Sequence, residues 1–301
     1  MTSHSYISNP KNEDIFININ GELLHRSNAK ISVFDSGFLL GDGVWEGIRL
    51  HKSKLVFFDD HIERLYASAK GISLDIPLSK KNIFDEINRV LNKNEMYDDI
   101  HIRLIVSRGD KITPYQNPNA NLGPVNMVII PEYKKADPKI YLEGLTIGRV
   151  PNIRPNDSIL NPHYNTLSKL NCILASIEAN KLGYDEGIMN DLNGNISTCN
   201  STNLFFITND RVLTSNGKYC LNGITRGKVI EICNKNDITC SENNFTFEDI
   251  KDCSEAFVTG TFAGIIPVSN LEGRILASTN NDSLVNKIRM LYNQEIKKCV
   301  G

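Results

Sequence analysis

The sequence predicts an α+β fold in two domains, and three observations support this prediction. Short β-rich runs are interspersed with segments whose apolar residues repeat at helical spacing. Asn20-Gly21 separates two β-rich runs and is a strong signal for a hairpin turn. The charged stretch EYKKADPK interrupts the pattern near the middle of the chain. We therefore expect an α/β domain at residues 1–132, a linker at 133–139 and a second α/β domain at 140–301.

The first domain is expected to contain two helices and several strands. A helix is predicted over residues 60–70, because its apolar residues recur at i, i+3, i+4 and i+7: Ile62, Leu65, Tyr66 and Ala69. Asp59 or Asp60 is expected to cap its start. A second helix is predicted over residues 81–92, followed by strands at 101–109 and 125–131.

The second domain is expected to mix strands and helices. The predicted strands are 141–150, 203–208 and 255–261, and the predicted helices are 167–181, 225–234 and 282–298. The helix over 167–181 is expected to bury a stripe of leucine and isoleucine side chains, namely Leu167, Leu170, Leu174 and Ile177. Lys169 would then lie at the margin of this stripe.

The composition is that of a soluble globular protein, with 41% hydrophobic and 23% charged residues. A net charge of −2 gives no reason to expect nucleic acid or an anionic membrane as a partner. The longest apolar stretches are strand-sized, and the polar N-terminus does not resemble a signal peptide. Seven cysteines without metal-ligand spacing favour a reduced, cytoplasmic protein with no metal site.

Six stretches in order along the chain resemble the class IV aminotransferases, the fold-type IV pyridoxal phosphate enzymes. They are GDGVWEGIRL, HIERLYASAKGISLDIP, ILASIEANKLGYDEGIM, NLFFI, LNGITRGKVIEIC and EAFVTGTFAGIIPV. The family includes branched-chain aminotransferases, D-amino acid aminotransferases and aminodeoxychorismate lyases. The resemblance implies a two-domain fold-type IV structure, a pyridoxal 5'-phosphate site at the domain interface, amino acid and keto acid substrates, and a homodimer.

The resemblance also implies which residues hold the phosphate of the cofactor. Arg64 matches the family's phosphate-binding arginine, and its planar guanidinium suits phosphate oxygens. Taken alone, it would be a surface arginine on an amphipathic helix. Two further stretches are expected to complete the cradle: Gly223, Ile224 and Thr225 at a helix start, and Gly260 with Thr261 after a strand. Their structural alternatives are a helix cap at Thr225 and a β-turn at Gly260.

Two positions depart from the family. The lysine that forms the Schiff base with the cofactor lies fourteen residues before the alanine that is Ala179 here, which places Asn165 in the lysine's position. An amide can neither form a Schiff base nor relay a proton. The family's glutamate that contacts the pyridine nitrogen is replaced by Thr198 in ISTC. A neutral hydroxyl would leave the ring a weaker electron sink than a carboxylate does.

Lys169 is the candidate substitute for the missing lysine. It follows Asn165 by four residues, and four residues advance a helix by about 6 Å. If the helix has begun by then, both side chains lie on one face and the lysine leans back over the vacated position. The alternative is an ordinary solvated helix lysine. A Schiff-base role would require burial to lower the pKa of Lys169.

Two residues are expected to contact the substrate. Arg103 matches the strand position from which branched-chain aminotransferases place an active-site arginine, and a substrate carboxylate is its expected ligand. Trp45, the sole tryptophan, lies where relatives have an aromatic residue in the substrate pocket, although a core position is the alternative. Arg108 either contributes to the site or closes its strand. The Arg-x-His pair of D-amino acid enzymes is not found in DKITPYQNP, which disfavours that substrate class.

The leading hypothesis is a pyridoxal phosphate-dependent aminotransferase of the branched-chain type, acting on a small amino acid, with Lys169 as a displaced Schiff-base lysine. Because Thr198 weakens the electron sink, a lyase or elimination reaction is an alternative. A second alternative is a degenerate protein that binds the cofactor or another ligand without transamination. A third is a cofactor-free enzyme that uses the same cleft.

Overall fold

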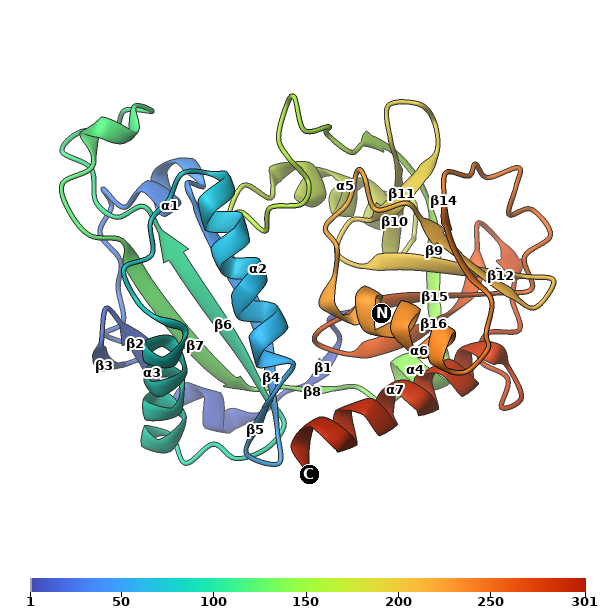
Figure 1. Cartoon of the computed structure of the whole chain (residues 1–301), viewed down its shortest axis with the longest axis horizontal. Helices are drawn as coiled ribbons and strands as arrows, with labels where there is room; N and C mark the ends of the chain where they lie inside the picture. Colours follow the sequence, from blue (N-terminus) through green and yellow to red (C-terminus); the bar gives the residue numbers. More distant parts are fainter. Residues whose placement is uncertain (1) are drawn as a thin grey trace.

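The computed structural model describes residues 2–301, and two β-sheets with their helices form its two halves (Figure 1). The strands are β1 (Tyr6–Ile7), β2 (Phe16–Ile19), β3 (Glu22–His25), β4 (Gly43–His51), β5 (Lys54–Val56), β6 (Ile100–Ser107), β7 (Asn126–Tyr133), β8 (Lys135–Ala136), β9 (Leu145–Ile153), β10 (Glu186–Asn190), β11 (Ile196–Cys199), β12 (Asn203–Thr208), β13 (Arg211–Ser215), β14 (Cys240–Asn243), β15 (Glu255–Gly260), β16 (Gly264–Leu271) and β17 (Arg274–Ile275). The helices are α1 (Ser36–Leu40), α2 (Phe58–Gly71), α3 (Lys80–Lys93), α4 (Lys139–Leu142), α5 (Leu170–Lys181), α6 (Ile224–Lys235) and α7 (Leu284–Val300), with short 3-10 turns at Pro10–Glu13 and Pro118–Ala120.

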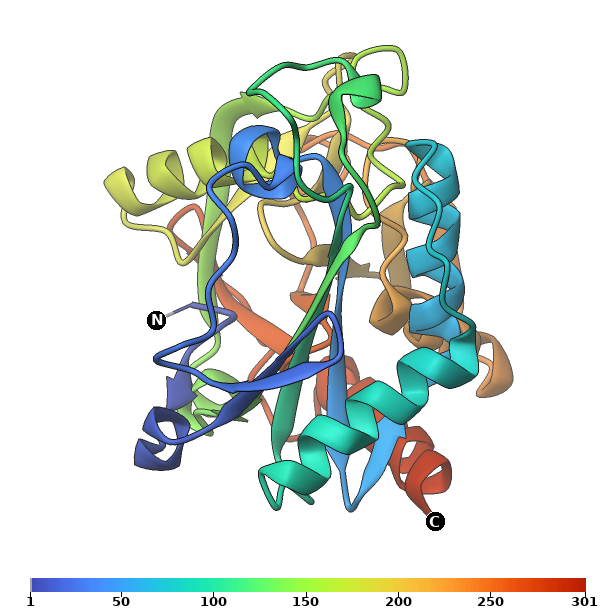
Figure 2. The ribbon, with the colours of Figure 1, turned by 90° about the vertical axis from the view of Figure 1, so that its left-hand side faces the viewer.

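The first half is a six-stranded sheet in the order β3-β2-β7-β6-β4-β5, with α2 and α3 packed against it (Figure 2). The predicted hairpin is confirmed: β2 and β3 pair antiparallel across Asn20 and Gly21, whose φ angles are 54° and 88°. The apolar face of α2 is buried, as its spacing predicts. The prediction of an aspartate cap for α2 is wrong, because Phe57 precedes the helix in a left-handed conformation and Asp59 and Asp60 lie in its first turn.

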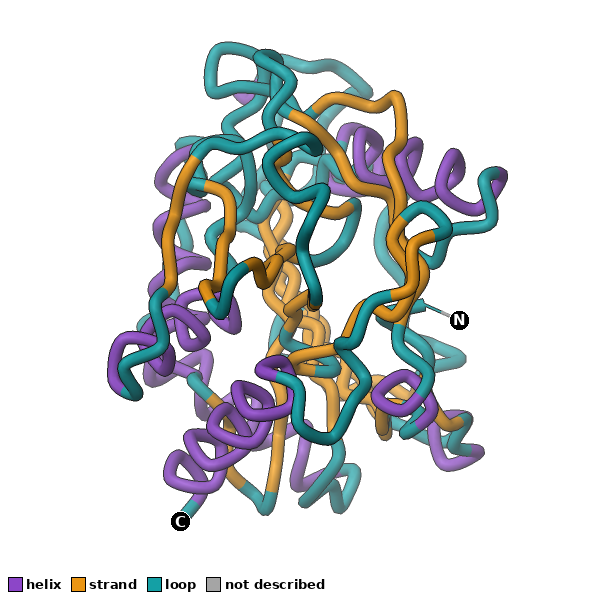
Figure 3. The backbone as a smooth tube through the Cα atoms, turned by 90° about the vertical axis from the view of Figure 1, so that its right-hand side faces the viewer, coloured by secondary structure: helices purple, strands orange, loops and turns teal. Residues whose placement is uncertain are grey.

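The second half is a nine-stranded sheet with β11-β10-β9-β16-β15-β12-β13-β14 as its main order. The strands lie at the centre of this half and the helices at its periphery (Figure 3). The predicted strand 203–208 is confirmed as β12, but β9 begins only at Leu145, because residues 139–142 form α4. The C-terminal helix α7 packs on β15 and β16 of its own half and on β5 of the first half. This helix therefore connects the two halves.

The predicted linker joins the two sheets. Residues 135–136 form β8, which pairs with β1 near the N-terminus. Figure 1 shows this small sheet between the two halves. The division into two domains at 133–139 stays a prediction, since independent folding of the halves is a separate property. Among residues 2–301, no helix has both the length and the apolar character needed to cross a membrane.

The expected orientation of α5 is wrong. Leu170 is 66% exposed, Leu174 45% and Ile177 43%, whereas the buried residues of this helix are Ala175 and Ala179. The small alanines let α5 lie close on β9 and β10, and the larger apolar side chains face outward. An outward stripe of this kind is typical of a surface that another molecule covers.

Candidate active site

A cavity of about 480 Å³ collects every site residue that the sequence predicts. These residues are Trp45, Arg64, Arg103, Asn165, Lys169, Thr198, Gly223, Ile224, Thr225, Gly260 and Thr261. They come from both halves: β4, α2 and β6 contribute from the first, and the start of α5, β11, the start of α6 and the end of β15 from the second. A site between the two halves is therefore present in the fold, and its residues are distant in sequence.

The wall from the first half is built by alternate residues of neighbouring strands. Gly47 of β4 pairs with Arg103 of β6, and Trp45 lies two residues before Gly47 on the same side. The Arg103 guanidinium stacks 3.8 Å from the centroid of the Trp45 ring. Among residues 2–301, no carboxylate forms an ion pair with this guanidinium. Burial lowers the pKa of Arg103, although it stays far above neutrality as arginines do. The wall thus presents a cation available to an anionic ligand.

Lys169 brings an amine to the same cavity. Its Nζ lies 5.7 Å from the centroid of the Trp45 ring. Burial lowers the pKa of Lys169 from its ordinary value of 10.5 to about 8; Cys172 opposes this shift, and the positive charges of Arg154 and Arg64 add to it. An amine with this pKa is partly neutral near physiological pH, and the neutral form is a nucleophile.

The helical geometry expected for Asn165 and Lys169 is wrong. The helix α5 begins at Leu170, with Lys169 as its N-cap residue. The segment before it runs alongside the start of β4 instead: Thr166 forms a bridge with Val44, and the Leu167 N–H donates to the Gly43 carbonyl over 2.9 Å. These backbone groups are taken by a strand, so they are not available for a helix. Both side chains nevertheless line the cavity.

Arg64 is held rigidly at the edge of the cavity. It donates two hydrogen bonds of 2.8 Å to the fully buried Glu46, and a third of 3.0 Å to the Asn222 carbonyl just before α6. His61 contacts the same carboxylate at 2.8 Å. Burial alone would raise the pKa of Glu46, but Arg64 and His61 outweigh it, and the pKa is lowered. The alternative of a plain surface arginine is wrong, because the Arg64 side chain is only 14% exposed.

The start of α6 is an open anion site facing the cavity. Gly223 is its N-cap, and no side chain of the described residues caps the N–H groups of the first turn. A Cβ at Gly223 would lie 2.3 Å from Asn203 Oδ1, so a glycine is needed for this close approach. On the opposite side, Thr259 precedes Gly260, and its buried hydroxyl has no partner among residues 2–301. Unpaired donors of both segments therefore line the same cavity.

Thr198 lies in the cavity, but its hydroxyl is engaged. It donates to the Thr202 carbonyl over 2.7 Å. The Thr202 hydroxyl in turn donates to Glu186 over 2.6 Å, and the Ser201 hydroxyl donates to the same carboxyl over 2.7 Å. Burial raises the pKa of Glu186, and these hydroxyls offset the rise only in part. The hydrogen of Thr198 is thus not available to a ligand.

Glu186 and the N-terminal segment are cavity residues that the sequence did not indicate. Ser3 is 3% exposed and donates to Glu186, and His4 stacks on Phe262 with ring centroids 6.1 Å apart. Glu186 begins the otherwise apolar run EGIM, and a carboxylate in such a run indicates a buried polar residue with a specific role. Nothing local in the polar N-terminus indicates that Ser3 is buried, because its partner is 183 residues away.

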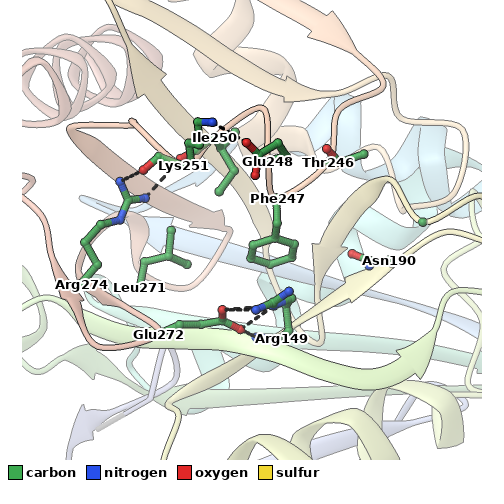
Figure 4. A pocket seen from close by; sticks show the side chains of 11 residues that line it. Arg149, Asn190, Thr246, Phe247, Glu248, Ile250, Lys251, Leu271, Glu272 and Arg274 are labelled. Carbon is green, nitrogen blue, oxygen red and sulfur yellow. Dashed lines mark hydrogen bonds and ion pairs between the residues drawn. The ribbon is translucent and has the colours of Figure 1, made fainter.

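A larger hollow of about 640 Å³ lies elsewhere, on the second half (Figure 4). Its charged side chains already have partners. Arg149 pairs with Glu272 at 2.8 Å, Lys251 pairs with Glu248, and Arg274 donates to backbone carbonyls. The charged side chains of this hollow therefore have partners, whereas Arg103 in the smaller cavity forms no ion pair with the described residues.

Comparisons with known proteins point to one family. The model of the amino-transferase class IV family matches residues 43–271. The branched-chain-amino-acid aminotransferase-like protein 2 of Arabidopsis thaliana is 34% identical over 289 residues, which are 95% of this chain and 51% of that protein. A D-alanine aminotransferase of Listeria monocytogenes is 28% identical over 291 residues, covering 94% of this chain and 96% of that protein.

Solved structures give the same result. The branched-chain aminotransferase of Thermoproteus uzoniensis, crystallised with norvaline, superposes with a TM-score of 0.84 at 27% identity, over 95% of this chain and 96% of that one. Fold and family match together define the class, and the chain belongs to the class IV aminotransferase family. The chain spans about half the length of the Arabidopsis relative, 51%.

Pyridoxal phosphate, the cofactor that the family implies, fits the residues present. The open start of α6, the Thr259 hydroxyl and the guanidinium of Arg64 supply donors for a phosphate at one end of the cavity. Lys169 supplies a partly neutral amine in the same cavity. The pyridine nitrogen is the exception, because Thr198 provides neither a charge nor a free hydrogen for it.

Proposed function

We propose that this chain is a pyridoxal phosphate-dependent aminotransferase of the branched-chain type, acting on a small amino acid and a keto acid, with Lys169 holding the cofactor covalently. One observation carries the proposal: the Lys169 amine, with its pKa lowered to about 8, lines the same cavity as the phosphate cradle around Arg64. The family membership supports the reaction class.

Each residue of the cavity has a role that follows from its chemistry. When bound, the cofactor supplies an electron-withdrawing ring that acidifies the α-hydrogen of an attached amino acid. Arg64 and the start of α6 bind the phosphate and fix the position of the ring. The Lys169 amine would accept the α-proton and deliver it to a different carbon, so that the amino group stays in the site when the keto acid leaves. Arg103 binds the substrate carboxylate, and Trp45 closes the pocket beside it.

The test is to reconstitute the protein with pyridoxal 5'-phosphate, reduce it with borohydride, and map the modified peptide by mass spectrometry. The expected result is a stable label on Lys169. A label on an exposed lysine such as Lys181, or none, would contradict the proposal.

A second candidate function is cofactor binding without efficient transamination. Two points favour it: the resemblance places Asn165 in the position of the family's lysine, and the Thr198 hydroxyl donates to the Thr202 carbonyl. A lyase or elimination reaction is the related alternative. Product analysis with the unreduced holoprotein separates them, because transamination yields a keto acid and the amine form of the cofactor, whereas elimination releases ammonia.

Arg103→Leu is expected to raise KM for the amino acid roughly 10- to 100-fold, since a charge-assisted hydrogen bond contributes about 1.5–3 kcal/mol. The kcat should change less, because the carboxylate is bound before and during the reaction. Steady-state kinetics measures both values. Arg211→Leu, at an exposed position on β13, is the matched control and should keep the wild-type KM. An unchanged KM for Arg103→Leu would remove Arg103 from the substrate site.

The homodimer implied by the family stays a prediction, and the exposed apolar stripe of α5 supports it. Leu174→Glu and Ile177→Glu together are expected to shift the protein from dimer to monomer in sedimentation velocity at micromolar concentration. A wild-type protein that sediments as a monomer would contradict this prediction.

A further inference from the structure

Asn165 carries an acceptor that no group among the described residues satisfies. The side chain is 1% exposed and lines the cavity. Its Nδ2 donates to the Trp45 carbonyl over 2.7 Å, while its Oδ1 is buried and has no partner among residues 2–301. A buried acceptor without a donor is unfavourable, and a ligand with a suitable N–H would relieve this cost.

The orientation of this amide is fixed. Rotating it by half a turn would place Oδ1 against the Trp45 carbonyl oxygen, which is an acceptor, so only one assignment is stable. The backbone is held as well: Trp45 donates to the Asn165 carbonyl over 3.0 Å, and the Asn165 N–H donates to Ser68 Oγ over 3.0 Å. The acceptor is therefore preorganised before any ligand arrives.

The complement of such an acceptor is a hydrogen-bond donor on the ligand. The same cavity offers donors to a phosphate at the start of α6 and at Arg64. The matching ligand then carries both a phosphate and an N–H. An aldehyde oxygen against Oδ1 would instead place two acceptors together.

We propose that the cavity binds the amine form of the cofactor, pyridoxamine 5'-phosphate, in preference to forms without an N–H at that carbon, with Asn165 Oδ1 accepting a hydrogen bond from the aminomethyl group. This inference rests on the proposed function and deepens it. It assigns Asn165 a positive role: the residue that replaces the family's lysine holds the product form of the first half-reaction, while Lys169 holds the aldehyde form from a neighbouring position.

The test compares two ligands that differ only at this carbon. Pyridoxamine 5'-phosphate and 4'-deoxypyridoxine 5'-phosphate, which has a methyl group in place of the aminomethyl group, are titrated into the cofactor-free protein by isothermal calorimetry. The wild-type protein is expected to bind the amine about tenfold more tightly. Asn165→Leu should reduce the difference to within about twofold, whereas Lys169→Met should retain it.

Each other outcome overturns the inference. Equal binding of the two ligands by the wild type would do so while leaving the proposed function intact. A preference that survives in Asn165→Leu, or that disappears in Lys169→Met, would assign it to another residue. Binding of neither ligand would overturn the inference and the proposed function together. Equal binding by the wild type overturns the inference even if Asn165→Leu does not fold.

Discussion

Lys169→Met is expected to lower the rate of amino transfer by roughly 100-fold or more, because one side chain both holds the cofactor and relays the proton. The methionine keeps the unbranched shape of the side chain in the cavity and removes only the amine. Single-turnover kinetics with the holoprotein measures the loss. Dialysis should also remove the cofactor from the variant, since only the phosphate cradle still binds it.

The pH dependence of the wild-type protein tests the same assignment. Burial lowers the pKa of Lys169 to about 8, so the amine loses its proton as pH rises through about 8 and not near its ordinary value of 10.5. Covalent attachment of the cofactor should accelerate over that range and level off above it. Lys181→Met is the control, because this exposed lysine at the C-terminal end of α5 pairs with Glu178 at the surface. Equal losses in the rate of amino transfer in Lys169→Met and Lys181→Met would contradict the role of Lys169.

Arg64→Met is expected to lower the free energy of unfolding by about 3–5 kcal/mol, because it leaves the fully buried Glu46 without its bidentate partner. It should also weaken binding of phosphate-bearing ligands. Urea unfolding of the cofactor-free protein separates the first effect from the second. Arg89→Met removes a half-exposed ion pair with Glu86 and should cost less than about 1 kcal/mol.

The stability loss should depend on pH in a defined direction. The pKa of Glu46 lies below its ordinary value of 4.5 in the wild type, so its contribution is present above that value and is lost as pH falls through the lowered pKa. In Arg64→Met, burial without the arginine favours the protonated acid. The two proteins should therefore become more alike in stability toward acid pH. A difference that stays constant down to pH 4 would contradict this account of Glu46.

The parts of the fold that the sequence predicted are those with local causes. The hairpin at Asn20-Gly21 follows from residues that tolerate positive φ, and α2 follows from its apolar spacing. The cavity residues followed from motif resemblance, and the structure brings all of them together. Periodicity alone would not have assembled them, because they come from seven separate elements and the segments that flank them.

The wrong predictions have non-local causes. Apolar spacing predicts too early a start for α5, because strand pairing with β4 takes the backbone of residues 166–167. It also predicts a buried apolar stripe, although spacing shows only that one face is apolar and not which surface covers it. The burial of Ser3 depends on a partner in β10, far along the chain.

The position of Trp45 has a practical consequence. As the sole tryptophan, it accounts for the indole emission of the chain, and two cations lie against its ring, Arg103 at 3.8 Å and Lys169 at 5.7 Å. Neutralising either cation, or inserting a light-absorbing heterocycle beside the ring, changes the field and the quenching that the indole experiences. The native protein thus contains its own optical reporter, and occupancy can be followed in real time without attaching a dye.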